Sequence, residues 1–422
     1  MRSRSLLYFA YPLAASLLLA AMGPVPAPAA DTGAEFPPGS VTFVESVPVE
    51  ADLDLPELPD TAAIWLDLVE GAERSLDIFA FYLSPNPDGV CRLQPVLAAI
   101  EARARAGVRV RVLSDRRFHD TYPQTHDRFD RHPDIAARLV DGRALWGGVL
   151  HGKGMVIDGE RFFLGSQNWD WRALEHIHEL GVVVVHGALA ADLQRLYDLD
   201  WALAGGELPP PVRSAVPEVP EWHPVRRLTL PDGRSCEAVL AASPPQSLPE
   251  GVPWDLPLLL DQIERAESRV RLVMLSYNPV GRDGAWWGGL DNALRRAAAR
   301  GCEVQILLSD WAKRPHMLPH IQSLAVLPRI AVRFVSIPAW SGGFIPFART
   351  EHAKFVTCDG RALWLGTSNG SRDYFHQSRN HSLLLRGEGC TDQADAYFTR
   401  TWESPYAATV DPCGHYTPPR RE

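Results

Sequence analysis

The stretch HGKGMVID, residues His151 to Asp158, is repeated in the second half of the chain as HAKFVTCD, residues His352 to Asp359. In both copies a lysine follows the histidine by two residues and an aspartate follows it by seven. GSQN (Gly165 to Asn168) and GTSN (Gly366 to Asn369) then begin at the same interval of fourteen residues from their histidines. Two copies that agree in both spacings indicate one structural unit that occurs twice.

The segments around the two motifs repeat the same order of elements. Thr61 to Asn86 and Leu93 to Asp115 each predict a helix followed by an apolar strand. The same order returns in Asp255 to Val280 and in Trp287 to Asp310. Alternating helices and strands favour an α/β fold in which helices cover a sheet. The duplication predicts two mostly parallel sheets, flanked by helices and packed about a pseudo-two-fold axis.

These repeats divide the chain into two halves, with further segments before and between them. We assign residues 61–208 to the first half and residues 255–422 to the second. Residues 31–60 are rich in proline and acidic residues, and we expect them to form a lead-in along the surface. Residues 209–254 contain two proline-rich runs, so we expect a stiff linker and a loop there.

Residues 1–30 have the pattern of a secretory signal peptide. Arg2 and Arg4 precede an apolar run from Leu6 to Met22, and small residues follow before Asp31. A retained anchor is the alternative, because the run is close to membrane-spanning length. No later stretch is long and apolar enough to span a bilayer, so cleavage would leave no stable membrane span. We therefore expect an exported protein, periplasmic or secreted.

Composition and charge limit the partners that the whole surface attracts. Hydrophobic residues make up 46% and charged residues 22% of the chain, which is typical of a folded soluble protein. The formal net charge is −9, and loss of residues 1–30 removes two arginines and no acid, which leaves −11. We therefore expect no broad attraction to nucleic acid or anionic lipid. Attraction for phosphate must come from a local group of cations.

The six cysteines have spacings that do not fit a zinc site. Export makes disulfides chemically accessible. Cys390 and Cys413 flank the last predicted helix, and we predict a bridge between them. Cys358 stands among strand residues and is interpreted as a buried thiol. The sequence predicts no metal site and no cofactor.

Strand geometry brings the polar residues of each motif together. Residues two apart in a strand project from the same face, so the histidine and lysine of one motif can face one ligand. The same rule aligns the serine or threonine of the trailing motif with its asparagine. The residues placed in the site in this way are His151, Lys153, Ser166 and Asn168 from the first copy, and His352, Lys354, Thr367 and Asn369 from the second.

This set of groups meets the needs of phosphodiester cleavage without a metal. One imidazole attacks phosphorus and forms a phosphohistidine, while the other protonates the departing alkoxide. The lysines and asparagines hold the non-bridging oxygens and offset charge in the transition state. The chain has only three lysines, and Lys153 and Lys354 occupy the motifs. Asp158 and Asp359, each followed by glycine, are expected to support the strand end in a turn.

The paired H-x-K-x4-D motifs with GSQN and GTSN resemble the signature of the phospholipase D superfamily. Gly165 to Val184, Phe344 to Phe355 and Thr401 to Tyr406 resemble the subgroup that contains the mammalian lysosomal phospholipase D-like 5′ exonucleases. The resemblance runs from about Thr61 to Cys413. It implies a parallel-sheet sandwich duplicated in one chain, and a site that acts on phosphodiesters.

The resemblance also implies roles for individual residues. His151 would be the nucleophile and His352 the acid. Glu179 stands eleven residues after Asn168, where many members carry an acid that orients a histidine, so we include it in the catalytic set. The matching place in the second half holds Asn380. This departure leaves open how one histidine is oriented, although an amide oxygen can still accept a hydrogen bond.

Other residues near the motifs have simpler interpretations. Four aromatic residues could stack on bases or line a lipid groove, although core packing explains the tryptophans equally well; they are Trp169, Trp171, Tyr374 and Phe375. Three histidines lack matched partners and are interpreted as packed or exposed, namely His176, His178 and His376. His126 and His132 belong to a polar segment that we expect to be a solvated loop near the site entrance.

Three functions are compatible with these motifs. The leading hypothesis is a 5′ exonuclease-like hydrolase of single-stranded nucleic acid, because of the resemblance to that subgroup. A phospholipase D or phosphatidyl transferase would use the same chemistry on phospholipids, but the sequence shows no clear membrane-docking amphipathic helix. An inactive phosphate-binding envelope protein is the third, against which the intact motifs argue. The expected partner is a phosphodiester substrate, and the oligomeric state stays open, a homo-oligomer included.

Overall fold

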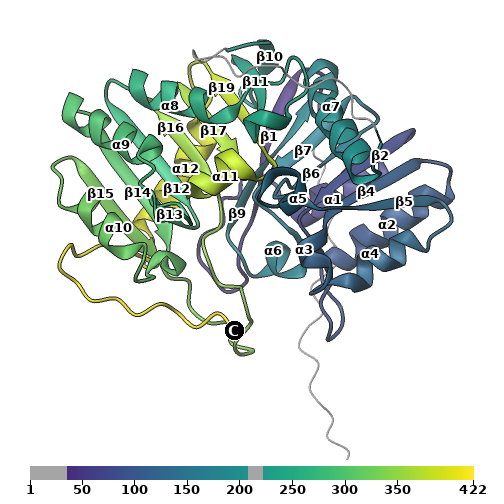
Figure 1. Cartoon of the computed structure of the whole chain (residues 1–422), viewed down its shortest axis with the longest axis horizontal. Helices are drawn as coiled ribbons and strands as arrows, with labels where there is room; N and C mark the ends of the chain where they lie inside the picture. The colour runs from purple at the N-terminus through teal and green to yellow at the C-terminus, as the bar shows by residue number, and fades with distance from the viewer. Residues whose placement is uncertain (1–35, 208–221) are drawn as a thin grey trace, which may run out of the picture.

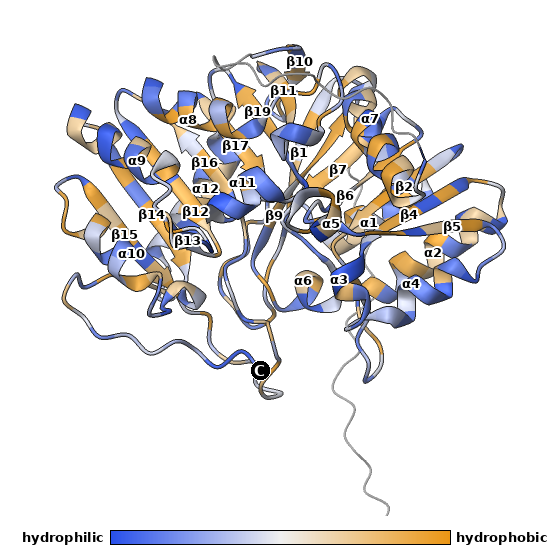
Figure 2. Ribbon diagram, in the orientation of Figure 1, coloured by the Kyte–Doolittle hydropathy of each residue, from blue (hydrophilic) through white to orange (hydrophobic). Residues whose placement is uncertain are grey.

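Two similar α/β units lie side by side and share one continuous sheet (Figure 1). The computed structural model describes residues 36–207 and 222–422. The predicted signal peptide and residues 208–221 of the predicted linker region lie outside the described residues. Figure 2 shows that the strands of the sheet are rich in hydrophobic residues, while hydrophilic residues are frequent on the surrounding helices and loops.

The first unit alternates helices and strands, and a hairpin region follows them. Its elements in chain order are β1 (Ser40–Ser46), α1 (Thr61–Glu70), β2 (Ser75–Ala80), β3 (Leu83–Ser84), α2 (Leu93–Arg105), β4 (Arg109–Asp115), α3 (Arg116–His119), α4 (Pro123–Asp130), β5 (Ile135–Val140), α5 (Gly142–Trp146), β6 (Gly154–Ile157), β7 (Arg161–Gly165), β8 (Trp169–Asp170), α6 (Trp171–Glu175), β9 (Glu179–Val185) and α7 (Gly187–Ala204).

The second unit repeats this order. Its elements are β10 (Arg226–Thr229), β11 (Ser235–Ser243), the short 3₁₀ helix η1 (Pro245–Ser247), α8 (Asp255–Arg265), β12 (Arg269–Met274), β13 (Tyr277–Asn278), α9 (Gly289–Arg300), β14 (Glu303–Ser309), the 3₁₀ helix η2 (Asp310–Ala312), α10 (Leu318–Ala325), β15 (Ile330–Val335), β16 (Phe355–Cys358), β17 (Ala362–Gly366), β18 (Gly370–Ser371), α11 (Arg372–Gln377), β19 (Asn380–Arg386), α12 (Asp392–Glu403) and β20 (Ala407–Thr409). Within the described residues, no helix has the length and apolarity needed to cross a membrane.

The four predicted helix–strand pairs are present as α1–β2, α2–β4, α8–β12 and α9–β14. Local chemistry sets their ends. The Asp60 side chain accepts a hydrogen bond from the Ala63 N–H and caps the start of α1, which then buries Ile64 and Trp65. α9 ends at Gly301, whose φ of 107° lies in the left-handed region that glycine adopts without strain.

The sheet is mixed, which differs from the prediction of two mostly parallel sheets. β2, β4 and β5 run parallel, as do β12, β14 and β15. Nearer the centre the strands pair antiparallel, with tight turns joining β6 to β7 and β16 to β17, except that β1 and β10 pair in parallel. The α/β class and the duplication are confirmed. The strand order is β20-β15-β14-β12-β16-β17-β19-β11-β10-β1-β9-β7-β6-β2-β4-β5.

Strands from outside the repeats join the two units. β1 lies in the predicted surface lead-in, and β10 and β11 lie in the predicted linker and loop. β1 pairs with β9 over seven residues, and β11 pairs with β19 over seven. Phe43 of β1 and Leu240 of β11 are buried in the core. The lead-in and linker predictions are wrong for these strands, because burial between the units decides their conformation rather than local composition.

The predicted disulfide between Cys390 and Cys413 is absent, and all six cysteines are free. Cys390 is buried just before α12, whereas Cys413 is exposed beyond the end of that helix. A helix of 12 residues is about 18 Å long, and a disulfide requires Cα atoms within about 7 Å. The helix between Cys390 and Cys413 therefore holds their thiols too far apart to form a disulfide. Cys358 is buried in β16.

A buried ion pair fastens the second unit to the first. Arg379, just before β19, donates through Nε and Nη2 to the carboxylate of Asp200 in α7 at 2.8 and 2.9 Å. Its remaining donors reach the carbonyls of Ser243 and Ser247 at 2.8 and 2.6 Å. Both charged side chains are fully buried. Each nitrogen of the guanidinium thus donates to a group of α7, β11 or η1.

Replacing Asp200 by alanine should lower the free energy of unfolding by about 3–5 kcal/mol, because it leaves the Arg379 charge buried and unpaired. Guanidinium denaturation followed by circular dichroism measures the change. The control is Glu160→Ala, which breaks an ion pair with Arg74 whose side chains are 58% and 67% exposed. That change should cost less than about 1 kcal/mol. Equal effects of the two substitutions would contradict the assigned role of the buried pair.

Candidate active site

The two motif histidines meet at one pocket between the units. His151 lies just before β6 and His352 just before β16, and both strands are near the middle of their units. Both imidazoles form the wall of a cavity of about 340 Å³, together with Asn168 and Asn369. The structure therefore brings together four of the side chains that the motifs predict, two from each half.

The hydrogen bond of His151 fixes its tautomer. Its Nδ1 lies 3.0 Å from Oδ1 of Asn380. The amide nitrogen of Asn380 donates to the carbonyls of Tyr374 and Ser378 at 2.7 and 3.2 Å, which leaves the amide oxygen facing the imidazole. Nδ1 of His151 therefore carries the proton and donates it. The lone pair on Nε2 is free to act as a nucleophile.

His352 has a carboxylate partner instead. Its Nδ1 lies 2.7 Å from Oε2 of Glu179, which is fully buried at the start of β9. Glu179 belongs to the first unit and His352 to the second, just as Asn380 belongs to the second and His151 to the first. Each histidine is therefore oriented by a side chain of the other unit. The sequence left open how one histidine is oriented, because Asn380 stands where an acid was expected. The structure shows that this histidine is His151, and that the Asn380 amide oxygen accepts its hydrogen bond.

These partners give the two imidazoles different proton affinities. Burial is the main cause that holds the pKa of His151 well below its usual value, and the ammonium groups of Lys153 and Lys354 lower it further. Burial also lowers the pKa of His352, but the Glu179 carboxylate opposes that effect. His151 is thus held neutral, while His352 is the imidazole that can hold a proton.

The two motif lysines lie behind the histidines. Both are buried, and each donates through Nζ to the carbonyl of the histidine in its own motif, at 2.6 Å from Lys153 to His151. Burial lowers the pKa of Lys153 far below its usual value, and the charge on Lys354 adds to the effect. Burial lowers the pKa of Lys354 to about 7, although Glu179 opposes the shift. Neither lysine forms part of the pocket wall.

The trailing motifs supply residues of two kinds. Asn168 and Asn369 line the pocket, and their buried Oδ1 atoms have no hydrogen-bond partner in the described structure. Ser166 and Thr367 are fully buried outside the pocket wall. The Ser166 hydroxyl donates to the Leu180 carbonyl at 3.2 Å. The Thr367 hydroxyl donates to Oδ1 of Asn380 at 2.9 Å, so it helps to fix the amide that orients His151.

The motif aspartates lie at the far ends of the motif strands. Asp158 accepts hydrogen bonds from the backbone N–H groups of Glu73, Arg74 and Ser75. Asp359 accepts the equivalent bonds from residues 267–269. Both have a φ of 57°, in the turn that closes the strand. They tie the motif strand to the start of the neighbouring strand and do not reach the pocket.

Aromatic rings cover the wall that the first unit contributes, and sequence patterns did not single them out. Phe81, Tyr82, Phe118 and Tyr122 line the pocket. Tyr82 stacks on Tyr122 with ring centroids 4.8 Å apart. Phe118 and Tyr122 come from the polar segment predicted to be a solvated loop, which instead forms α3 and α4. Their signal was the presence of aromatic residues in an otherwise polar stretch, which also contains the buried Phe129.

Tyr374 is the aromatic residue after the second motif that reaches the pocket. Its ring centroid lies 4.8 Å from that of His151, on which Phe81 also packs at 4.9 Å. Trp169 instead packs in the core against Trp65, with centroids 4.3 Å apart. The remaining aromatic candidates, Trp171 and Phe375, are outside the pocket wall.

Among the other histidines, His178 has a partner that the sequence did not reveal. Its Nδ1 lies 2.7 Å from Oε2 of Glu351, and its ring stacks on Tyr397 with centroids 4.1 Å apart. The other candidates, His126, His176 and His376, have pKa values lowered mainly by burial. In the residues that the structure describes, no group of three or more His, Cys, Asp or Glu side chains is arranged to hold a metal ion.

Comparison with known proteins identifies the family. Residues 66–201 and 259–402 match the family described as "Cardiolipin synthase, PLD-like domain". The chain belongs to the phospholipase D superfamily. It is 33% identical over 409 residues to the human protein named 5'-3' exonuclease PLD3, covering 89% of this chain and 82% of the relative. It is 34% identical to the Bos taurus protein of that name and 29% identical to Phospholipase D Z of Dictyostelium discoideum.

Solved structures show the same superfamily fold at low sequence identity. Phosphatidylserine synthase from Haemophilus influenzae superimposes with a TM-score of 0.57 at 14% identity, covering 83% of this chain and 85% of that one. Polyphosphate kinase from Porphyromonas gingivalis gives 0.53 at 11% identity, with coverage of 88% and 48%. These likenesses concern the fold alone.

Glu179→Gln should move the descending limb of the kcat/KM–pH profile to lower pH. The carboxylate raises the pKa of His352, so its loss lowers that pKa, and the protonated acid disappears at a lower pH. We expect kcat/KM at neutral pH to fall about 10- to 100-fold. The control is Glu45→Gln, at a buried carboxyl on β1 that bonds the Leu55 N–H. An unshifted descending limb in Glu179→Gln would contradict the role of the carboxylate.

Proposed function

We propose that this protein is a metal-independent phosphodiesterase that works through a phosphohistidine and degrades single-stranded nucleic acid from the 5′ end. The observation that carries the proposal is the pair of histidines in one pocket, one bound to an amide and the other to a carboxylate. An amide partner leaves the imidazole neutral, and a carboxylate favours the imidazolium. Attack on phosphorus needs the first form, and protonation of the leaving group needs the second.

The reaction follows from these proton positions. Nε2 of His151 bonds to phosphorus while the bond from phosphorus to the leaving oxygen breaks, and His352 gives its Nε2 proton to that oxygen. In the second step His352 removes a proton from water, and the water oxygen bonds to phosphorus. The bond between His151 and phosphorus then breaks. Both imidazoles return to their starting forms, so the cycle is balanced without another reactant.

The lysines and asparagines would stabilise the phosphate during both steps. Lys153 and Lys354 are held in the buried site with lowered pKa values. A phosphate anion beside them raises those pKa values again, so substrate binding favours the ammonium forms. The ammonium groups then offset the charge that develops on the non-bridging oxygens.

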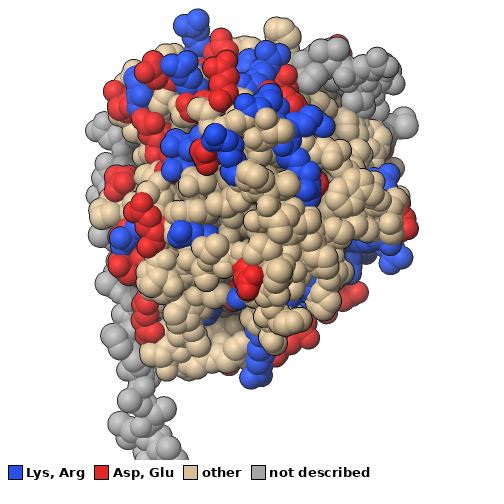
Figure 3. All heavy atoms as spheres, turned by 90° about the vertical axis from the view of Figure 1, so that its left-hand side faces the viewer, with Lys and Arg blue, Asp and Glu red and all other residues tan. Residues whose placement is uncertain are grey.

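Two observations support nucleic acid as the substrate. Relatives named 5'-3' exonuclease PLD3 match 89% of the chain at about one-third identity. The aromatic wall of Phe81, Tyr82, Phe118 and Tyr122 suits the flat faces of bases, which stack on such rings regardless of sequence. Figure 3 shows charges of both signs mixed over the outer face of the second unit rather than a broad basic surface. Since the formal net charge of the chain is −9, we expect positive charge for the substrate to be local.

The proposed place of action is outside the cytoplasm, in the periplasm or the medium. The supporting observation is the order of arginines, apolar run and small residues in residues 1–30. Cleavage after that segment would release the two described units as a free protein.

Purified protein should shorten 5′-labelled single-stranded DNA or RNA in the presence of a chelator. His151→Ala should slow this reaction by about four orders of magnitude or more, because the nucleophile is lost. Gel analysis of the labelled products measures both rates, and circular dichroism checks that the variant is folded. Absence of cleavage over a broad pH range would contradict the proposal. Formation of a phosphatidyl alcohol from phospholipid vesicles and a primary alcohol would instead identify a phosphatidyl transferase.

His352→Ala should trap the covalent intermediate when the leaving group needs no proton. Bis(p-nitrophenyl) phosphate releases nitrophenolate, so His151 can still be phosphorylated, but water then lacks its base. We expect a burst of one nitrophenolate per enzyme and an acid-labile p-nitrophenylphosphoryl group on the peptide that contains His151. Stopped-flow absorbance and mass spectrometry at neutral pH measure the two. A label on a peptide without His151 would contradict the assignment of the nucleophile.

A further inference from the structure

A second cavity opens beside the catalytic pocket, on the second unit. Its volume is about 540 Å³. The two cavities have five wall residues in common and are therefore adjacent; these residues are Leu275, Trp311, Asn369, Tyr374 and Arg421. We call the second cavity the arginine groove. A long substrate bound at the two histidines would therefore have this groove next to it.

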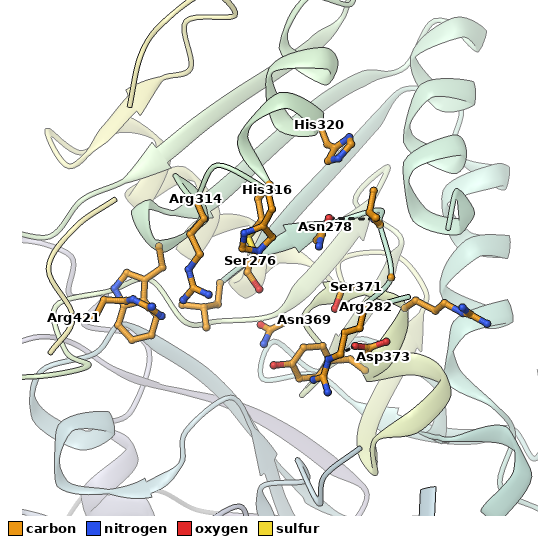
Figure 4. A pocket seen from close by; sticks show the side chains of 17 residues that line it. Ser276, Asn278, Arg282, Arg314, His316, His320, Asn369, Ser371, Asp373 and Arg421 are labelled. Carbon is orange, nitrogen blue, oxygen red and sulfur yellow. Dashed lines mark hydrogen bonds and ion pairs between the residues drawn. The ribbon is translucent and has the colours of Figure 1, made fainter. Parts of the chain in front are cut away.

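The arginine groove holds two cations that the protein itself does not neutralise. Arg282 pairs with Asp373 at 2.6 Å. Arg372, also in the wall, pairs with a surface aspartate. In contrast, Arg314 and Arg421 have no ion pair and no side-chain hydrogen bond to any described residue. Figure 4 shows these two side chains on one side of the cavity, with Asn369 between them and the Arg282–Asp373 pair.

The fold places the backbone of both arginines beside the groove. Arg314 follows η2, the short helix that carries Trp311. The backbone carbonyl of Arg421 accepts a hydrogen bond from the Phe347 N–H at 3.0 Å, which holds the C-terminal segment against the site. The Arg421 guanidinium lies 5.4 Å from the centroid of the Trp311 ring. An aromatic ring with one guanidinium beside it, in a cavity that holds a second unpaired guanidinium, is a combination that suits single-stranded nucleic acid.

The opposite wall of the catalytic pocket offers no such cation. Its rings Phe81, Tyr82 and Tyr122 are uncharged, and its one arginine, Arg172, is bound to Asp170 by both Nε and Nη2. The space on that side suits a base, whereas the space over the second unit suits a chain of phosphates. The site is therefore asymmetric about the scissile bond.

We propose that the arginine groove binds the part of a single-stranded polynucleotide that continues beyond the scissile phosphodiester. Arg314 and Arg421 contact its backbone phosphates, and Trp311 stacks on one of its bases. The inference rests on the proposed function and adds the path of the strand to it. It explains how a protein with a net charge of −9 holds a polyanion, because two local cations face the substrate where it leaves the catalytic pocket.

The test compares a long oligothymidylate with bis(p-nitrophenyl) phosphate, which has no continuing strand. In Arg314→Gln and in Arg421→Gln, the ratio of kcat/KM for the oligonucleotide to that for the small substrate should fall about tenfold. Arg361→Gln is the matched control, because Arg361 lines a separate cavity of about 540 Å³ at the far end of β16. Its ratio should equal that of the unchanged protein, and thermal melting checks the fold of each variant.

The dependence of binding affinity on salt concentration is a second measurement. A folding defect would lower the affinity without the predicted change in this dependence. In the His151→Ala background, fluorescence anisotropy measures oligothymidylate affinity across a series of sodium chloride concentrations. Each arginine-to-glutamine change should reduce the slope of log K against log salt by about 0.7, the value for one phosphate contact on a single strand. Arg314→Lys keeps the charge, so it should keep the slope.

The outcomes separate the inference from the function on which it rests. Cleavage of the oligonucleotide with an unchanged ratio and an unchanged slope in both glutamine variants overturns the groove and leaves the exonuclease intact. Cleavage of bis(p-nitrophenyl) phosphate without binding or cleavage of the oligonucleotide overturns both. Loss of activity on phosphatidylglycerol vesicles, with the oligonucleotide unaffected, also overturns the inference, because the groove would then hold a lipid headgroup.

Discussion

The site depends on hydrogen bonds that cross between the two units. Asn380 of the second unit orients His151 of the first, and Glu179 of the first orients His352 of the second. Backbone pairing keeps these groups in register, since the His151 N–H bonds the Arg379 carbonyl and the His352 N–H bonds the His178 carbonyl, at 2.8 and 2.9 Å. Neither unit alone holds a complete site. The duplication is therefore a requirement of the chemistry, and β1, β10 and β11 serve it by joining the units into one sheet.

A single difference between the repeats breaks the symmetry of the site. Both histidines are buried beside two lysines, so burial and like charge lower both pKa values. The partner at Nδ1 is what separates them, because a carboxylate supports an imidazolium and an amide does not. Glutamate and asparagine at equivalent positions thus give the two histidines of otherwise similar motifs different hydrogen-bond partners. In the proposed mechanism, this difference makes His151 the nucleophile and His352 the acid.

The sequence predicted what depends on short-range spacing and repetition. The helix–strand pairs and the motif residues are set by local periodicity, and duplication doubled the signal. The sequence could not predict the strands β1 and β11. Their apolar residues favour a strand only because the two units bury them in the shared sheet. Phe118 and Tyr122 were missed for a similar reason, since they lie on short helices in a charged segment. The predicted disulfide between Cys390 and Cys413 was wrong because the two residues lie at opposite ends of a 12-residue helix, which holds them far apart.

The presence of lysine rather than arginine in both motifs has a physical reason that the sequence alone did not show. Lys153 and Lys354 are buried, and each lowers the proton affinity of the site around it. Arginine stays charged in proteins, so two buried guanidiniums would repel each other whenever the pocket is empty. An amine with a pKa of about 7, such as Lys354, can release its proton in the empty site and regain it when a phosphate arrives. Lysine therefore allows the charge of the buried site to change when a phosphate binds, which a permanently charged arginine would not allow.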